Sequence, residues 1–86
     1  MTDTSQTSLQ ADATLDCREL LCPLPVFRAA LALDKLEEGR TLELICTDPG
    51  SLEDIPAMAR QRGDTLLVAE NRGTTQVFHI EKGPRR

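Results

Sequence analysis

The chain has 86 residues, enough for one domain with a thin hydrophobic core. Its formal net charge is −4 and its aromatic residues are Phe27 and Phe78, which excludes a nucleic-acid-binding module built on basic surface and aromatic stacking platforms. No apolar run approaches the roughly 20 residues of a membrane span. Residues 1–13 lack the basic and apolar segments of a secretion signal. We therefore expect a cytoplasmic protein that contacts neither a membrane nor nucleic acid directly.

The first half of the chain predicts a tail, a strand and a helix. Residues 1–12 are polar and lack periodicity, so we expect a flexible tail there. Residues 14–18 alternate between polar and apolar side chains, which predicts a strand. A helix is expected at 23–38, with Pro23 in its first turn and Gly39 after its end. Its apolar face repeats at helical spacing and comprises Val26, Ala29, Ala30, Leu33 and Leu36.

A second strand is expected at 41–47, followed by a turn at Asp48-Pro49-Gly50. The helix that follows lies within 51–62, and its start is ambiguous because Pro56 has no amide donor. Either Ser51 and Asp54 form a capping box, or the first turn is distorted and Asp54 caps a helix that becomes regular there. We favour the second arrangement.

The last two strands are expected at 65–70 and 75–81, joined by a hairpin at Asn71-Arg72-Gly73. The order βαβαββ predicts an α/β (α+β) two-layer sandwich, in which a mixed four-stranded sheet carries both helices on one face. We expect a single domain at 13–83 and a basic tail at 84–86. The basic segment from Lys82 to Arg86 is typical of a solvated terminus, with contact to an anion or an acidic partner as the alternative.

The three cysteines have different expected surroundings. An odd number of cysteines in a small chain of this kind does not indicate a disulfide framework. Strand alternation places Cys17 and Cys46 on the core face. Cys22 instead precedes a helix and is framed by Pro23 and Pro25. Because free amides and the helix dipole favour an anion at such an entrance, we expect a lowered Cys22 pKa and take Cys22 as the candidate nucleophile.

The other titratable residues give weaker candidates. His79 and the three cysteines are ligand types for zinc, but no Cys-x-x-Cys pair is present and strand alternation turns His79 away from the core. The same alternation disfavours a catalytic pair of Cys22 and His79. No carboxylate pair suits acid–base catalysis, because Asp48 and Asp54 are expected to form the turn and cap the helix.

Residues 15–26, LDCRELLCPLPV, resemble the N-terminal signature of the TusA/SirA-like sulfur-carrier family, whose hallmark is Cys-Pro-x-Pro. The resemblance continues through the stretches at 47–51 and 54–56 to Lys82, and so covers about residues 14–82. It implies the same βαβαββ sandwich, with Cys22 as the catalytic residue. The supporting residues that we name are Glu19, Pro23, Pro25, Asp48 and Lys82.

The resemblance implies a sulfurtransferase without a cofactor, acting as a monomer. Cys22 would hold sulfane sulfur as a persulfide, accepted from a cysteine desulfurase or a rhodanese-type donor. The sulfur would pass to a downstream relay protein, for tRNA thiolation, molybdenum-cofactor synthesis or sulfur oxidation.

The chain departs from the family pattern at Glu19, where the family usually has glycine, and at Asp64, where it often has histidine. The charge of Glu19 is expected to oppose a lowered Cys22 pKa. Two alternatives remain open: a non-catalytic regulatory or binding domain, and a redox switch that pairs Cys17 with Cys22.

Overall fold

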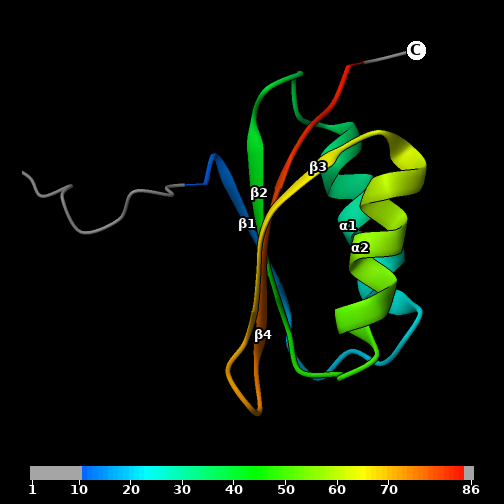
Figure 1. The fold of residues 1–86 in the computed structure, drawn as a ribbon, viewed down its shortest axis with the longest axis vertical. Helices are drawn as coiled ribbons and strands as arrows, with labels where there is room; N and C mark the ends of the chain where they lie inside the picture. Colours follow the sequence, from blue (N-terminus) through cyan, green and yellow to red (C-terminus); the bar gives the residue numbers. More distant parts are fainter. Residues whose placement is uncertain (1–10, 85–86) are drawn as a thin grey trace, which may run out of the picture.

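The computed structural model describes residues 11–84, so the tail predictions for residues 1–10 and for Arg85 and Arg86 lie outside the described residues. The predicted order βαβαββ is confirmed (Figure 1). The elements are β1 (Ala13–Cys17), α1 (Leu24–Asp34), β2 (Thr41–Cys46), α2 (Ser51–Arg62), β3 (Thr65–Asn71) and β4 (Gln76–Glu81). No helix within 11–84 is long and apolar enough to cross a membrane.

The four strands form one mixed sheet in the order β1-β2-β4-β3. β1 runs parallel to β2, while β4 runs antiparallel to both β2 and β3. Both helices cover one face of the sheet, with α1 against β1 and β2 and α2 against β3 and β4 (Figure 1). This is the predicted two-layer α+β sandwich, and it brings the entrances of both helices to the same end of the sheet (Figure 1).

The core lies between the sheet and the helices. Its largest fully buried side chains include Phe78, Leu33, Leu42, Leu44, Ile55 and Ile80. Cys17 and Cys46 are also fully buried and stand opposite each other in the register of β1 and β2, as strand alternation predicts. Burial raises the pKa of Cys17, and it raises the pKa of Cys46 to about 11. Both residues are therefore neutral core thiols at physiological pH.

Helix α1 ends earlier than the predicted residue 38. It stops at Asp34, and the chain beyond it meets the segment after β4, where the Gly39 amide donates to the Lys82 carbonyl at 2.9 Å. The ammonium group of Lys82 donates hydrogen bonds to the carbonyl oxygens of Leu33 and Leu36, at 2.9 and 3.1 Å. The Leu33 carbonyl also accepts the Leu36 amide, so the ammonium group adds a second donor there and bonds the chain just beyond the helix end at Leu36. The expectation that Lys82 belongs to a solvated tail is wrong, since its side chain is buried against this helix end.

Helix α2 begins at Ser51, three residues before the start that we favoured. Backbone carbonyls of the preceding turn accept the first amides: Ser51 donates to Asp48, Leu52 to Pro49, and Glu53 and Asp54 both donate to Gly50. The turn thus caps the helix with its own backbone, and no side chain forms the cap. Pro56 lies inside the helix, where its missing amide costs one hydrogen bond to the turn before it.

Asp12 also differs from the expectation of a tail through residue 12. Its backbone amide donates to the Thr41 carbonyl at 3.0 Å, and its carboxylate accepts the Thr41 amide at 2.9 Å. The ordered chain therefore begins before β1.

Gly83 packs against the turn that ends α2. A Cβ atom at Gly83 would lie 1.9 Å from the carbonyl oxygen of Gly63, so the backbone would have to move. We expect Gly83→Ala to lower the free energy of unfolding by about 1–3 kcal/mol, as overpacking does. Urea denaturation checks this value. Gly50→Ala is the matched control, since its Cβ would approach its nearest neighbour, an Asp48 carboxylate oxygen, only to 3.6 Å; equal losses in the two variants would contradict the prediction.

Candidate functional site

The loop between β1 and α1 carries Cys22 at the end of the sheet where both helices begin (Figure 1). Glu19 in this loop has a φ of 71°, in the left-handed region that favours glycine. Its amide donates to the Thr47 hydroxyl at 2.7 Å, which ties the loop to the end of β2. The peptide bond between Cys22 and Pro23 is cis, and α1 starts directly after Pro23.

Asp48 connects this loop to the turn before α2. One carboxylate oxygen of Asp48 accepts the backbone amide of Cys22 at 2.8 Å, and the other accepts the amide of Gly50 at 3.1 Å. The sequence predicts the turn role of Asp48. The bond to Cys22 is additional, and it fixes the backbone of the candidate nucleophile against the second helix entrance.

The thiol of Cys22 is exposed and faces the first turn of α2. Its Sγ donates a hydrogen bond to Oδ2 of Asp54 at 2.8 Å. We expected Asp54 to cap the helix. It instead accepts the hydrogen bond of the thiol. A shallow hollow of about 310 Å³ opens beside the sulfur. Its lining comprises Cys22, Pro23, Val26, Asp54, Ala57, Met58 and Gln61.

The expectation of a lowered Cys22 pKa is wrong. The hydrogen bond to Asp54 raises the pKa of this thiol, and partial desolvation and the negative charges of Asp54 and Asp48 raise it further. The expected free amides are absent from the start of α1, because the amides of Leu24, Val26 and Phe27 already donate to backbone carbonyls and Pro25 has none. Cys22 in the free protein is thus a neutral thiol at physiological pH.

Lys82 and His79 lie apart from Cys22. Lys82 binds the carbonyl end of α1, whereas Cys22 precedes the opposite end of that helix. His79 is nearly buried on the other face of the sheet, with Nε2 3.4 Å from the Glu43 carboxylate. Pro23 follows Cys22 directly and lines the hollow beside its sulfur, and Pro25 is buried in the first turn of α1. Within residues 11–84, no cluster of three histidine, cysteine or acidic side chains could hold a metal ion.

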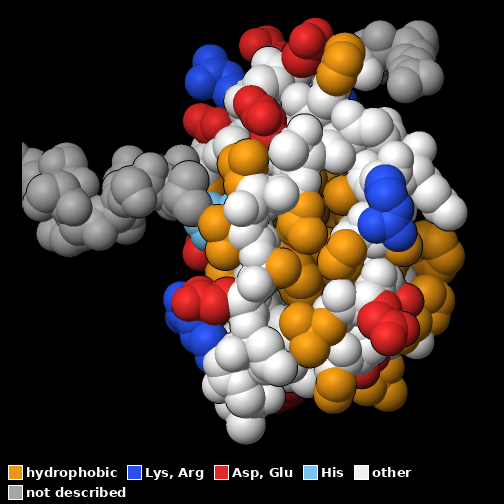
Figure 2. Space-filling view, viewed as in Figure 1, with side chains coloured by type: hydrophobic (Ala, Val, Ile, Leu, Met, Phe, Trp, Pro, Cys, Tyr) orange, Lys and Arg blue, Asp and Glu red, His pale blue; other side chains and the backbone are white. Residues whose placement is uncertain are grey.

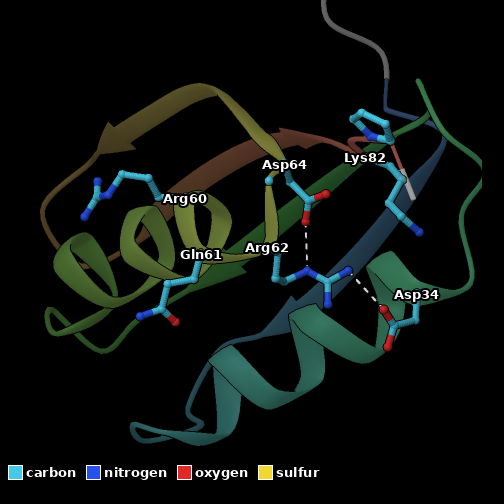
Figure 3. A pocket seen from close by; sticks show the side chains of 8 residues that line it. Asp34, Arg60, Gln61, Arg62, Asp64 and Lys82 are labelled. Carbon is cyan, nitrogen blue, oxygen red and sulfur yellow. Dashed lines mark hydrogen bonds and ion pairs between the residues drawn. The ribbon is translucent and has the colours of Figure 1, made fainter. Parts of the chain in front are cut away.

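A second hollow, of about 430 Å³, lies at the far end of the helices from Cys22 (Figure 3). Arg62 reaches across it and pairs with Asp34 at 3.0 Å and with Asp64 at 2.8 Å. Asp64 also accepts the amide of Gly83 at 2.8 Å, so its carboxylate holds the segment after β4 against the end of α2. Arg62 and Asp64 are thus paired with each other, and the residues around this hollow have a structural role.

Apolar side chains are exposed on α1 and in the loop before it, on the helical side of the molecule, where Figure 2 shows hydrophobic groups at the surface. We call them the α1 stripe: Leu21, Leu24, Phe27 and Leu31, with exposed fractions of 71%, 46%, 59% and 60%. Three of the four recur at helical spacing, so they share one face of α1. The stripe leads away from Cys22 along the helix.

The family model described as sulfurtransferase TusA matches residues 13–82, which include the whole sheet, both helices and the Cys22 loop. The chain belongs to this family. It is 41% identical over 71 residues to the sulfur carrier protein TusA of Allochromatium vinosum, covering 83% of this chain and 93% of that protein. It is 36% identical over 75 residues to the putative sulfur carrier protein YrkI of Bacillus subtilis, covering 87% of this chain and 100% of that protein.

The crystal structure of the SirA-like protein from Desulfitobacterium hafniense superposes with a TM-score of 0.68 at 28% identity. The match covers 84% of this chain and 99% of the other. Membership of the TusA family supports a sulfur-carrier role, and it implies that the protein meets other proteins that give and take sulfur.

The sequence did not reveal Asp54 as a partner of the thiol. A helix N-terminus attracts acidic residues for capping, and that ordinary explanation was sufficient for Asp54. The available signal was the chain order: α1 and α2 follow parallel neighbouring strands, so their entrances meet at one sheet end. A carboxylate in the first turn of α2 therefore lies within reach of a residue just before α1.

Glu19 has a left-handed backbone, which favours glycine, the residue that the resemblance led us to expect at this position. We expect Glu19→Gly to have a free energy of unfolding about 1 kcal/mol higher than Glu19→Ala, because alanine retains the Cβ strain. Urea denaturation of the two variants measures the difference. An alanine variant as stable as the glycine variant would show that residue 19 is not strained.

Proposed function

We propose that this protein carries sulfane sulfur as a persulfide on Cys22 and relays it to an acceptor protein. The observation that carries the proposal is the contrast among its cysteines. Cys22 is exposed at the Cys-Pro-x-Pro motif beside a shallow hollow, whereas Cys17 and Cys46 are fully buried. Sulfur exchange depends on access as well as on thiolate, so Cys22 is the thiol that a donor can reach.

The proposed reaction is an exchange of one sulfur atom. The Cys22 thiolate attacks the outer sulfur of a protonated persulfide on the donor, a new S–S bond forms, and the donor's S–S bond breaks. The electron pair of that bond leaves with the donor sulfur as a thiolate, which takes up the proton released when Cys22 ionised. An acceptor cysteine repeats the exchange on the Cys22 persulfide. The two transfer steps involve no net oxidation and use no cofactor.

The buried position of Cys17 favours a carrier over the redox switch that the sequence left open. Cys17 lies in the core opposite Cys46, and its backbone is separated from Cys22 by a turn in which Leu20 donates to the Cys17 carbonyl. A second thiol within reach of the persulfide would discharge it. Placing Cys17 in the core protects the sulfur in transit.

We propose that the donor and the acceptor both bind to the α1 stripe. Exposed apolar groups gathered on one helix face are typical of a protein-binding surface, and this stripe begins at Leu21, next to Cys22. A cysteine desulfurase or a rhodanese-type protein would supply the sulfur. The acceptor would serve tRNA thiolation, molybdenum-cofactor synthesis or sulfur oxidation. The protein would act in the cytoplasm as a monomeric sulfurtransferase.

Incubation with a cysteine desulfurase and cysteine, or with a rhodanese and thiosulfate, is expected to add one sulfur atom to Cys22. Trypsin separates the three cysteines, since residues 19–28 contain Cys22 alone between Arg18 and Arg28. Mass spectrometry without reductant then locates the added sulfur, with the peptides of Cys17 and Cys46 as internal controls. Unmodified Cys22 with both donors, or sulfur on the other peptides alone, would refute the proposal.

Loss of the α1 stripe is expected to weaken sulfur loading without changing the thiol. Phe27→Ser should raise the KM for the donor protein about tenfold or more, the effect of losing an interface anchor, with little change in kcat. Leu67→Ser is the matched control, because Leu67 is 42% exposed on β3, far from α1 in the sheet order. Equal effects of both variants, or none of Phe27→Ser, would place the donor elsewhere.

A further inference from the structure

Two carboxylates lie at the Cys22 thiol and its backbone amide. Asp54 of α2 binds the sulfur at 2.8 Å, and Asp48 of the preceding turn binds the Cys22 amide at 2.8 Å. The hollow beside the sulfur has no lysine, arginine or histidine in its described lining. Charged groups therefore act on this thiol in one direction, against its ionisation.

Asp54 is not suited to ionise Cys22 by taking its proton. The ordinary pKa of cysteine lies about 4–5 above that of aspartate, so the shared proton stays on sulfur. The hydrogen bond that the thiol donates would be lost on ionisation, and a thiolate would stand against the carboxylate. The contact consequently stabilises the protonated sulfur.

We propose that Asp54 is a positioning residue that keeps Cys22 in its unreactive thiol form until a donor protein covers the site. The inference rests on the proposed function of Cys22 as the sulfur carrier and adds how that site is regulated. The free carrier would resist small electrophiles and stray disulfides in spite of its exposed sulfur. A docked donor that places a cationic or hydrogen-bonding group on Asp54 would withdraw the carboxylate from the thiol and release the nucleophile.

The test is the pH dependence of Cys22 alkylation by iodoacetamide in the full chain, followed on the peptide of residues 19–28. Asp54→Asn is expected to move the midpoint of the pH profile downward. If the midpoint falls by about one pH unit, the fraction of thiolate at pH values below the midpoint rises about tenfold. The nucleophilicity of the thiolate falls at the same time, with a Brønsted slope of about 0.4–0.5. The alkylation rate at pH 7 should then be about threefold that of the wild type.

Glu53→Gln is the matched control, because Glu53 is an exposed carboxylate of the same helix turn and does not line the hollow beside Cys22. Its profile should equal that of the wild type. Asp54→Ala removes the charge without adding an amide donor, and it should move the profile in the same direction as Asp54→Asn. Circular dichroism confirms that each variant is folded, and if Asp54→Asn unfolds, Asp54→Ala decides the question.

A midpoint unchanged or raised in the folded Asp54 variants would overturn the proposal, as would an equal fall of the midpoint in Glu53→Gln. The assay contains no sulfur donor, so its outcome is independent of whether Cys22 carries sulfur. A failed alkylation test together with a positive sulfur-mass measurement would remove the role of Asp54 and leave the carrier function intact. The reverse result would remove the carrier function alone.

Discussion

The Asp48 carboxylate connects the starts of the two helices through two hydrogen bonds, and the geometry of the site depends on them. One oxygen holds the Cys22 amide before α1, and the other holds the Gly50 amide before α2. Because β1 and β2 are parallel neighbours, both entrances lie at one end of the sheet, where a short side chain can bridge them. Asp54 then meets the sulfur from the first turn of α2. The thiol is thus exposed and yet fixed in direction.

Opposing electrostatic effects meet at this sulfur. The start of α1 provides the positive end of a dipole, an effect that is modest at an exposed helix end and is screened by salt, while its first amides are already bonded to the carbonyls of Leu21 and Pro23. Asp54 accepts a hydrogen bond from the thiol, and Asp48 accepts one from the backbone amide of Cys22. The nearer charges decide the outcome, and the pKa of Cys22 rises. An exposed sulfur that is neutral at rest is compatible with a carrier that reacts only inside a complex.

The fold could be predicted almost completely from the sequence, because glycine and proline positions and the strand alternation mark each element and its buried face. The burial of Cys17 and Cys46 followed from the same alternation. The errors arose where distant segments meet. The end of α1 depends on Lys82, which comes from the far end of the chain, and the pKa of Cys22 depends on Asp54 of the next helix. Local patterns in a sequence carry no information on such contacts until the topology is known.

The central claim is that acidic neighbours hold this exposed thiol neutral. The most direct test follows the Cys22 Cβ chemical shift by NMR as the pH is raised, in the folded protein and in the isolated peptide of residues 19–28. The peptide keeps Glu19, Pro23 and Pro25 but lacks Asp48 and Asp54. We predict a higher titration midpoint in the folded protein than in the peptide. A midpoint equal to or below that of the peptide would contradict this prediction, because the helix entrance would then outweigh the carboxylates.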